Sequence, residues 1–444
     1  MSKKSISLGL FLTVPGHHVV AWRHPDVKKE HMINFQFIKE QVLLAEQSKF
    51  DIAFLGDVII TGYDSPSFGS QLVGRFEPFT LLSSLAAVTE KIGLIGTVST
   101  TYNEPYNVAR KFASLDHLSN GRAGWNIVTS TGKEIANNFN GLDLQHHERY
   151  ERAEEFVKLT TKLWDSWEDD ALIFDQKNGQ YLDPNKVHPV QHEGKYFSVK
   201  GPLNITRPVQ GHPVLVQAGS SHDGKELGAQ FAEVVFTASQ TLEDAQAFYA
   251  DLKGRLAKYG RSADELKIMP GLYPIVGRTE EEAKIKQQIL LDLIPEEIGL
   301  AHLSANLGVD LSSYPLDGPL PELPDVSEIN GIKSRFELIK SLADREQLTI
   351  RQLYQRIAGA RGHREIVGTP EQIADFIEEW VTNKGADGFN IMPPILPNGL
   401  TDFVELVVPE LQKRGLFRTE YEGETLREHL GLKRPQNQYE ASLI

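Results

Sequence analysis

Short apolar runs separated by longer amphipathic stretches constrain the fold of this chain more than any other feature. Each run is bounded by glycine or polar residues. Runs of this kind are typical of strands that are buried on both faces and followed by a covering helix. We expect eight strands, at Ile6–Leu12, Ile52–Leu55, Gly93–Val98, Gly124–Val128, Pro213–Ala218, Val234–Thr237, Ile268–Val276 and Gly388–Met392.

Helix signals lie between these runs. Pro78 stands in the first turn of a predicted helix whose one face carries Leu81, Leu82, Leu85 and Val88. A second helix has Thr369 as its N-cap, Pro370 at its first position and Gln372 completing a capping box. Eight β/α alternations in 444 residues favour an α/β fold, a closed (β/α)8 TIM barrel, over an open sheet.

We expect one barrel domain over residues 1–444, with two insertions. Residues 168–212 separate a helix from the fifth strand by more than a loop normally needs, and residues 310–332, rich in proline, form an irregular second insertion. Insertions on the active-site side of a barrel become lids or partner surfaces, so both are candidates for substrate selection and dimer contacts. From about Arg418 the chain reads as a polar tail that wraps the body.

Composition excludes several classes of function. The formal charge of 46 − 60 = −14 disfavours nucleic-acid and anionic membrane partners, and the absence of cysteine removes disulfides, thiolate nucleophiles and thiolate metal sites. The apolar start, Ile6–Val14, superficially resembles a secretory signal, but no small-residue cleavage pattern follows it. No apolar run approaches the ~18 residues of a membrane span. We expect a cytoplasmic protein.

Polar residues gather where the predicted strands end. The carboxyl ends of barrel strands meet on one rim, which is where barrel enzymes place their active sites. Taken singly, an Asp or Ser in this place is often only an N-cap. Their coincidence on one rim predicts a site that includes Asp57, Thr97, Ser99, Asn126, Thr129, Ser130, Ser220 and Ser221.

The segment Gln217–Lys225 is the most informative local signal. An apolar strand runs into a Gly/Ser turn and then a helix, which presents backbone N–H groups and hydroxyls to an anion. The segment nearly matches a P-loop, but Glu226 stands where that motif needs Ser or Thr for magnesium. A phosphate monoester such as that of FMN needs no magnesium ligand and suits this turn.

Two pairs of residues add to the candidate site. His146 and Tyr150 lie four residues apart at the start of a helical stretch, so both side chains can reach a phosphate from the same helix face. The same spacing also fits a His that caps the helix and a Tyr that packs in the core. His17 and His18 follow the first strand. Adjacent residues of an extended chain point opposite ways, so they cannot form a His-x-His metal pair. We expect no metal, and without a Gly-x-Gly-x-x-Gly fingerprint we expect no nicotinamide bound in a Rossmann unit.

The run Ala113–Ser130, with Gly124-Trp-Asn-Ile-Val-Thr-Ser130 at its end, resembles the nitrilotriacetate monooxygenase component A group of bacterial-luciferase-like FMN-dependent monooxygenases. The resemblance covers nearly the whole chain, and together its pieces are specific. The other matching pieces are Trp22–Pro25, Arg75–Pro78, His146–Tyr150, Gly201–Asn204, Gln217–Ser221, Val367–Pro370 and Arg427–Gly431.

This resemblance implies a barrel enzyme, a homodimer or homotetramer, that takes FMNH₂ from a separate NAD(P)H:flavin reductase. It implies insertion of one oxygen atom from O₂ into a small organic substrate containing N or S. Carried over by position, Asp57 and Thr97 meet the isoalloxazine ring, Asn126 lines its pocket, and a further set holds the phosphate. That set is His146, Tyr150, Ser220 and Ser221. His17 or His18 is the candidate proton donor.

Three alternatives stay open at this point: a deazaflavin-dependent oxidoreductase, a non-catalytic flavin-binding protein, and a metal-dependent barrel hydrolase. The substrate is equally open. A polycarboxylate would need converging cations, which Arg23, Arg75 or Arg122 could supply, although arginines on a barrel rim often pair with Asp and Glu.

Overall fold

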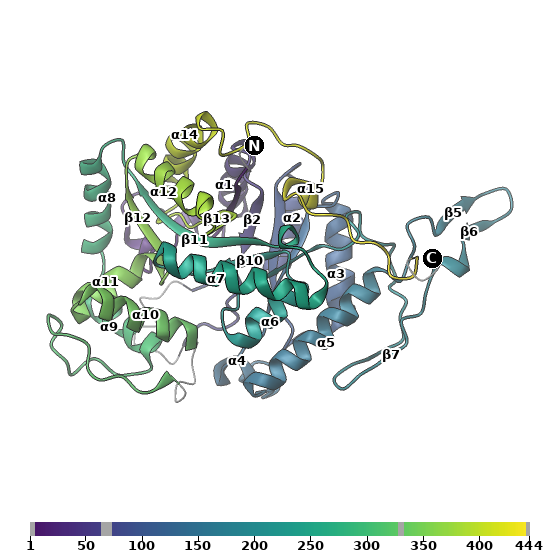
Figure 1. Ribbon diagram of the computed structural model, residues 1–444, viewed down its shortest axis with the longest axis horizontal. Helices are drawn as coiled ribbons and strands as arrows, with labels where there is room; N and C mark the ends of the chain where they lie inside the picture. The colour runs from purple at the N-terminus through teal and green to yellow at the C-terminus, as the bar shows by residue number, and fades with distance from the viewer. Residues whose placement is uncertain (1–4, 64–72, 327–332, 441–444) are drawn as a thin grey trace.

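Eight parallel strands close into a barrel in the computed structural model, which describes residues 5–63, 73–326 and 333–440 (Figure 1). Strand β1 pairs with both β2 and β13, and β10 pairs with both β9 and β11, so the sheet has no open edge between them. The predicted barrel is confirmed, and every expected strand is present within one residue of its expected ends. In barrel order the strands are β1 Ser7–Phe11, β2 Ile52–Leu55, β3 Gly93–Ser99, β4 Ala123–Val128, β9 Val214–Gln217, β10 Val234–Thr237, β11 Lys267–Val276 and β13 Gly388–Ile391.

Helices surround the barrel, and local sequence decides where two of them begin. Helix α2 starts at Pro78 with the Glu77 side chain accepting from two backbone N–H groups, and α12 starts at Pro370 with the capping box of Thr369 in place. No helix in the described ranges is long and apolar enough to cross a membrane. The helices of the barrel layer are α1 Phe35–Gln47, α2 Pro78–Ala86, α3 Pro105–Leu118, α4 Lys133–Asn137, α5 His146–Trp164, α6 His222–Phe231, α7 Leu242–Arg255, α8 Glu280–Asp292, α12 Pro370–Thr382, α13 Asn398–Asp402 and α14 Val408–Lys413.

A helical unit with its own core stands between β11 and β13. Its helices are α9 Glu296–Leu307, α10 Lys333–Glu346 and α11 Ile350–Ala360, and they bury a separate apolar cluster. The segment 310–326 between α9 and α10 is irregular, and residues 327–332 of the predicted insertion lie outside the described residues. Strand β12, Arg364–Gly368, which the sequence did not predict, pairs with the far half of β11.

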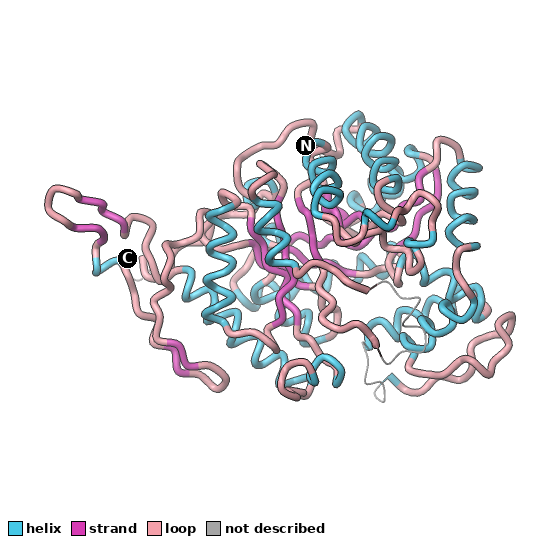
Figure 2. The backbone as a smooth tube through the Cα atoms, turned by 180° about the vertical axis from the view of Figure 1, so that it is seen from behind, coloured by secondary structure: helices cyan, strands magenta, loops and turns pink. Residues whose placement is uncertain are grey.

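The insertion at 168–212 forms two hairpins instead of a long loop. Strands β5 Leu172–Asp175 and β6 Gln180–Leu182 form the first, and β7 His192–Glu193 and β8 Ser198–Val199 form the second. Both project from the side of the barrel (Figures 1 and 2). The first hairpin, which we call the arm, exposes the apolar side chains of Leu172, Ile173, Phe174 and Tyr181.

The C-terminal tail closes the bottom of the barrel. Leu426 of the short helix α15 (Leu426–His429), with Leu430 and Leu432, packs against inward-facing strand residues. Gly93 makes room, because a Cβ there would lie 2.3 Å from Leu426. Arg427 anchors this plug through Glu233, with its Nη2 2.8 Å from a carboxylate oxygen. The prediction of a polar tail is therefore wrong for these leucines, which are buried.

Candidate functional site

The carboxyl ends of neighbouring strands bring several predicted residues to one cavity. Asp57, which follows β2, and Thr97 and Ser99 of β3 line a cavity of about 250 Å³ together with Ser130, which follows β4. The parallel register of β2, β3 and β4 places these strand ends side by side. The cavity lies at the end of the barrel where barrel enzymes hold their ligands.

Thr97 and Asn126 are joined by a side-chain hydrogen bond at this rim. They face each other in the β3–β4 register, and the Asn126 Nδ2 donates to Thr97 Oγ1 at 2.9 Å. Thr97 Oγ1 in turn donates to the Leu55 carbonyl oxygen at 2.8 Å. Both side chains are buried, and Asn126 Oδ1 has no hydrogen-bond partner among the described residues. A buried acceptor of this kind is costly unless a ligand donates to it.

Asp57 is a more exposed member of the same cavity. Partial desolvation raises the pKa of its carboxyl group, and the nearby Glu77 carboxylate raises it further. The positive charge of Arg75 opposes this shift. Asp57 is thus a carboxyl group whose charge state responds to a ligand placed beside it.

The predicted phosphate turn links β9 to α6. Ser221 is the N-cap of α6 and accepts from the Gly224 N–H at 3.1 Å, while its Oγ lies 3.5 Å from the Tyr150 hydroxyl oxygen. A Cβ at Gly219 would lie 3.0 Å from Gly224 Cα and 3.3 Å from the Tyr150 hydroxyl oxygen. The glycines therefore let the turn close tightly over the start of the helix. Ser220, next to Ser221, is half-buried at this turn.

His146 completes the polar surround of the turn. It begins α5, and its Nδ1 lies 3.1 Å from a carboxylate oxygen of Asp223 in the first turn of α6. Its ring centroid lies 4.9 Å from that of Tyr150. The starts of α5 and α6 thus converge with an imidazole and two hydroxyl groups. Helix N-termini carry partial positive charge, so this arrangement suits an anion.

The two predicted catalytic histidines are buried. The chain bends at 14–18 and turns at 19–20 instead of running extended, so the expectation of opposed side chains on an extended segment is wrong. His17 Nε2 lies 2.7 Å from the Phe11 carbonyl oxygen, which can only accept, so this nitrogen carries the proton. Burial lowers the pKa of both His17 and His18 to about 3, with the positive charge of Arg361 adding to it. Neutral imidazoles with these contacts give no support to a proton-donor role.

Comparison with known proteins decides the family. The luciferase-like monooxygenase family profile matches residues 14–388. The chain belongs to the luciferase-like monooxygenase family. It is 55% identical over 439 residues, 98% of this chain and 99% of the other, to N-acetyl-S-(2-succino)cysteine monooxygenase of Bacillus subtilis (strain 168). It is 53% identical over 448 residues, 98% of each chain, to nitrilotriacetate monooxygenase component A of Aminobacter aminovorans.

Solved structures agree with this assignment. The crystal structure of long-chain alkane monooxygenase (LadA) superposes with a TM-score of 0.85 at 34% identity, covering 99% of this chain and 100% of the other. The predicted family, fold and flavin-dependent monooxygenase activity are confirmed. None of these comparisons tests the individual site residues, which therefore remain predictions.

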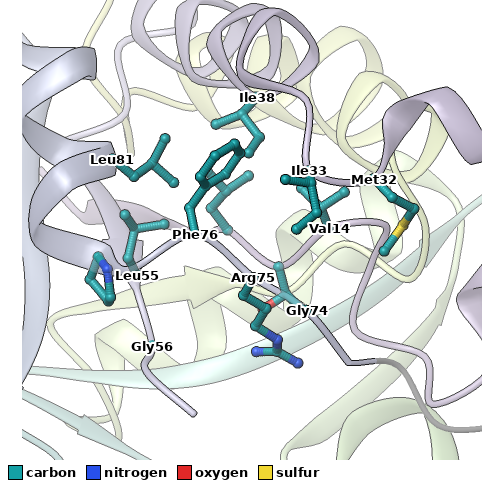
Figure 3. A pocket seen from close by; sticks show the side chains of 13 residues that line it. Val14, Met32, Ile33, Ile38, Leu55, Gly56, Gly74, Arg75, Phe76 and Leu81 are labelled. Atoms are coloured by element: carbon teal, nitrogen blue, oxygen red, sulfur yellow. The ribbon is translucent and has the colours of Figure 1, made fainter. Parts of the chain in front are cut away.

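A second cavity near this rim is not evident from the sequence. Behind Asp57, a small cavity lies between the ends of β1 and β2 and the start of α2, and apolar side chains such as Val14, Ile38 and Leu81 line it (Figure 3). Arg75 is its charged lining residue. The sequence shows Arg75–Pro78 as a motif, and the folded chain places it beside the end of β1.

Proposed function

We propose that this monooxygenase uses FMNH₂, delivered by a separate NAD(P)H:flavin reductase, to insert one oxygen atom of O₂ into a small organic compound containing N or S. The observation that carries the proposal is the anion-binding turn after β9, next in the barrel to the strand of Asn126. The relative named as a component A supports a system of two proteins. The proposed substrate class is taken from the names of two relatives, which are 55% and 53% identical to this chain.

The residues present fit reduced FMN. His146, Tyr150, Ser220 and Ser221 surround the N-terminus of α6, where two hydroxyls and an imidazole suit a phosphate. The donor set needs no magnesium, in agreement with Glu226 in place of a Ser or Thr. On the neighbouring strands, Thr97, Asn126 and Asp57 would hold the isoalloxazine ring. Asn126 Oδ1 is buried and has no hydrogen-bond partner in the described part of the chain, so it would serve as an acceptor for the flavin.

The flavin supplies the redox chemistry when it is bound, because it carries the two electrons with which O₂ is activated. The protein positions the ring and keeps the reaction away from water. Phe11, Phe54 and Phe236 pack edge to face inside the barrel mouth, with ring centroids 4.9 Å apart for Phe11 and Phe54. Such an apolar floor excludes water from the reacting face.

Oxygen insertion at a carbon that carries N or S has a definite outcome. The C–H bond becomes C–OH, the C–N or C–S bond then breaks, and the carbon leaves as a carbonyl compound while the amine or thiol takes the proton. The other oxygen atom leaves as water. The reaction therefore needs no metal and no covalent link to the protein.

The experiment combines the purified protein with an unrelated flavin reductase, NADH, FMN and ¹⁸O₂. Succinylated N-acetylcysteine and nitrilotriacetate serve as probes, following the relatives. We expect ¹⁸O in the carbonyl product and less hydrogen peroxide when a substrate is present. Flavin binding with hydrogen peroxide as the only product for every probe would favour a flavin-binding protein. Activity with a reduced deazaflavin and none with FMNH₂ would overturn the proposal.

The proposal includes a homodimer or homotetramer held in part by the arm. Isolated two-stranded hairpins are marginally stable in water, and the exposed fractions of Phe174 and Tyr181 are 63% and 60%. A second copy of the chain covers these side chains. Light scattering of a Phe174→Ser/Tyr181→Ser variant tests this: we expect a smaller particle than the wild type, and an unchanged mass would remove the arm from the interface.

A further inference from the structure

The three arginines that the sequence offered as cations for an anionic substrate differ sharply in the folded chain. Arg122 is buried, and its guanidinium bonds to backbone oxygens and a hydroxyl, among them the Ile92 carbonyl at 2.7 Å and the Thr89 carbonyl at 2.8 Å. Arg122 is therefore structural. Arg23 is exposed and donates to the Leu293 carbonyl oxygen, on the side of the helical unit.

Arg75 is different. Among the residues that the structure describes, no hydrogen bond or ion pair engages its guanidinium. Arg75 lines a cavity together with Leu12, just past β1, and Leu55, the last residue of β2. Its positive charge contributes to lowering the pKa of His17 and opposes the raised pKa of Asp57. Desolvation lowers the pKa of Arg75 itself, yet an arginine stays charged at neutral pH. Its five donors are thus available at the barrel mouth.

The cavity beside Arg75 is apolar and small. Its volume is about 50 Å³, and the side chains of Val14, Ile33, Ile38, Phe76 and Leu81 contribute to its walls. Figure 3 shows these side chains together and the Arg75 guanidinium pointing away from them. Since one water needs roughly 10–15 Å³ of such space, a short alkyl group fits and an aromatic ring does not.

We infer that this cavity and Arg75 form a subsite for a small carboxylic acid with a short alkyl group, the alkyl group in the cavity and the carboxylate on the guanidinium. As a substrate subsite this inference rests on the proposed function. A guanidinium binds a carboxylate through two parallel hydrogen bonds, which fixes its orientation as well as its charge. The subsite therefore selects an anion held between the apolar cavity and the flavin side of the rim.

Asp57 limits which acids bind. Its carboxylate repels a second anion on the flavin side, so a single carboxylate placed at Arg75 is favoured over one that reaches toward Asp57. Arg75 thus contributes specificity, and it takes no part in bond breaking.

Binding to the protein without flavin, NADH or O₂ tests the inference separately from the reaction. The probes are (propylthio)acetate and its neutral amide, with dissociation constants from NMR titration. We expect Arg75→Gln to weaken the acid by about tenfold or more, which is the usual effect of losing a charged hydrogen bond, and to leave the amide unchanged. Arg75→Lys keeps part of the affinity for the acid. Arg23→Gln, the matched control, changes neither.

A second variant tests the apolar half. Ile33 is 54% exposed, so Ile33→Trp fills the cavity mouth without disturbing the core. We expect it to weaken (propylthio)acetate and to spare (methylthio)acetate. Equal affinities for acid and amide in the wild type, or an Arg75→Gln variant that binds the acid as the wild type does, would overturn the inference. If the acid binds as expected and no probe is oxygenated, the proposed function fails and the subsite stands.

Discussion

Asn126 donates a hydrogen bond from its side-chain amide to the Thr97 hydroxyl at 2.9 Å, across two strands whose register places the residues opposite each other. Because the Thr97 hydroxyl donates its own hydrogen bond to the Leu55 carbonyl oxygen, the order of donors and acceptors along these three groups is fixed. The amide of Asn126 is thereby oriented with Oδ1 left for a ligand. The two hydrogen bonds join β2, β3 and β4 at the rim where we propose that the flavin binds.

Thr97→Val removes the middle of this chain while keeping the side-chain volume. It leaves Asn126 Nδ2 without its acceptor and removes the side-chain bond to the Leu55 carbonyl, so we expect a loss of about 1–3 kcal/mol in the free energy of unfolding. Because Asn126 then loses its orientation, we also expect FMN to bind about tenfold more weakly in a fluorescence titration. Thr100→Val is the control, since Thr100 Oγ1 donates to the Val128 carbonyl oxygen at 3.2 Å and Thr100 itself does not line the cavity. Equal FMN affinities in the two variants would contradict the assignment.

Tyr150→Phe tests the phosphate turn. If the Tyr150 hydroxyl binds the phosphate, we expect the affinity for FMN to fall by about three- to tenfold, as for the loss of one hydrogen bond, and the affinity for riboflavin to stay the same. Tyr259→Phe serves as the control, because its hydroxyl contacts Glu226 on the outer part of α6 at 2.6 Å. A parallel fall for FMN and riboflavin would place Tyr150 elsewhere than at the phosphate.

The buried His18 side chain should make the free energy of unfolding depend on pH. Burial lowers its pKa to about 3 in the folded state, whereas an unfolded chain binds the proton near pH 6.5. Between these values the unfolded state holds more protons, so acid destabilises the fold by up to about 1.4 kcal/mol per pH unit. Asp51, whose pKa burial raises to about 6, acts in the opposite direction in that range.

The measurement is therefore the difference in free energy of unfolding between wild type and His18→Asn, from urea titrations at several pH values. We expect the advantage of the wild type to shrink as the pH falls from 6.5 toward 4. A difference that stays constant over this range would mean that His18 is already protonated in the folded state.

The strands and caps of this protein follow from local sequence, whereas the site depends on distant pairings. The capping box of Thr369 and Gln372 can be predicted from the sequence, because all of its contacts lie within one helical turn. The sequence identifies Arg75 only as a cation. In the described part of the chain no group bonds to its guanidinium, whereas that of Arg122 is fully bonded, and this difference depends on where β1 and β2 end. The sequence does not predict strand β12, because most of its residues are only partly buried and its partner, β11, lies far away in sequence.

Contacts between residues distant in sequence also decide the burial of the C-terminal tail, which gives a final prediction. Leu426 sits among polar residues in sequence, yet it is fully buried against the lower barrel residues Ile52, Ile95 and Val214. Leu426→Ala leaves a cavity beneath Gly93 that the strands cannot fill, so we expect a loss of about 2–5 kcal/mol in the free energy of unfolding. Leu118→Ala, at a leucine that is 66% exposed, should change it by less than about 0.5 kcal/mol. Chemical denaturation of both variants measures this loss. We expect both variants to keep their affinity for FMN, because the plug and the rim proposed to bind flavin stand at opposite ends of the barrel. A Leu426→Ala variant as stable as Leu118→Ala would show that the tail lies on the barrel without supporting it.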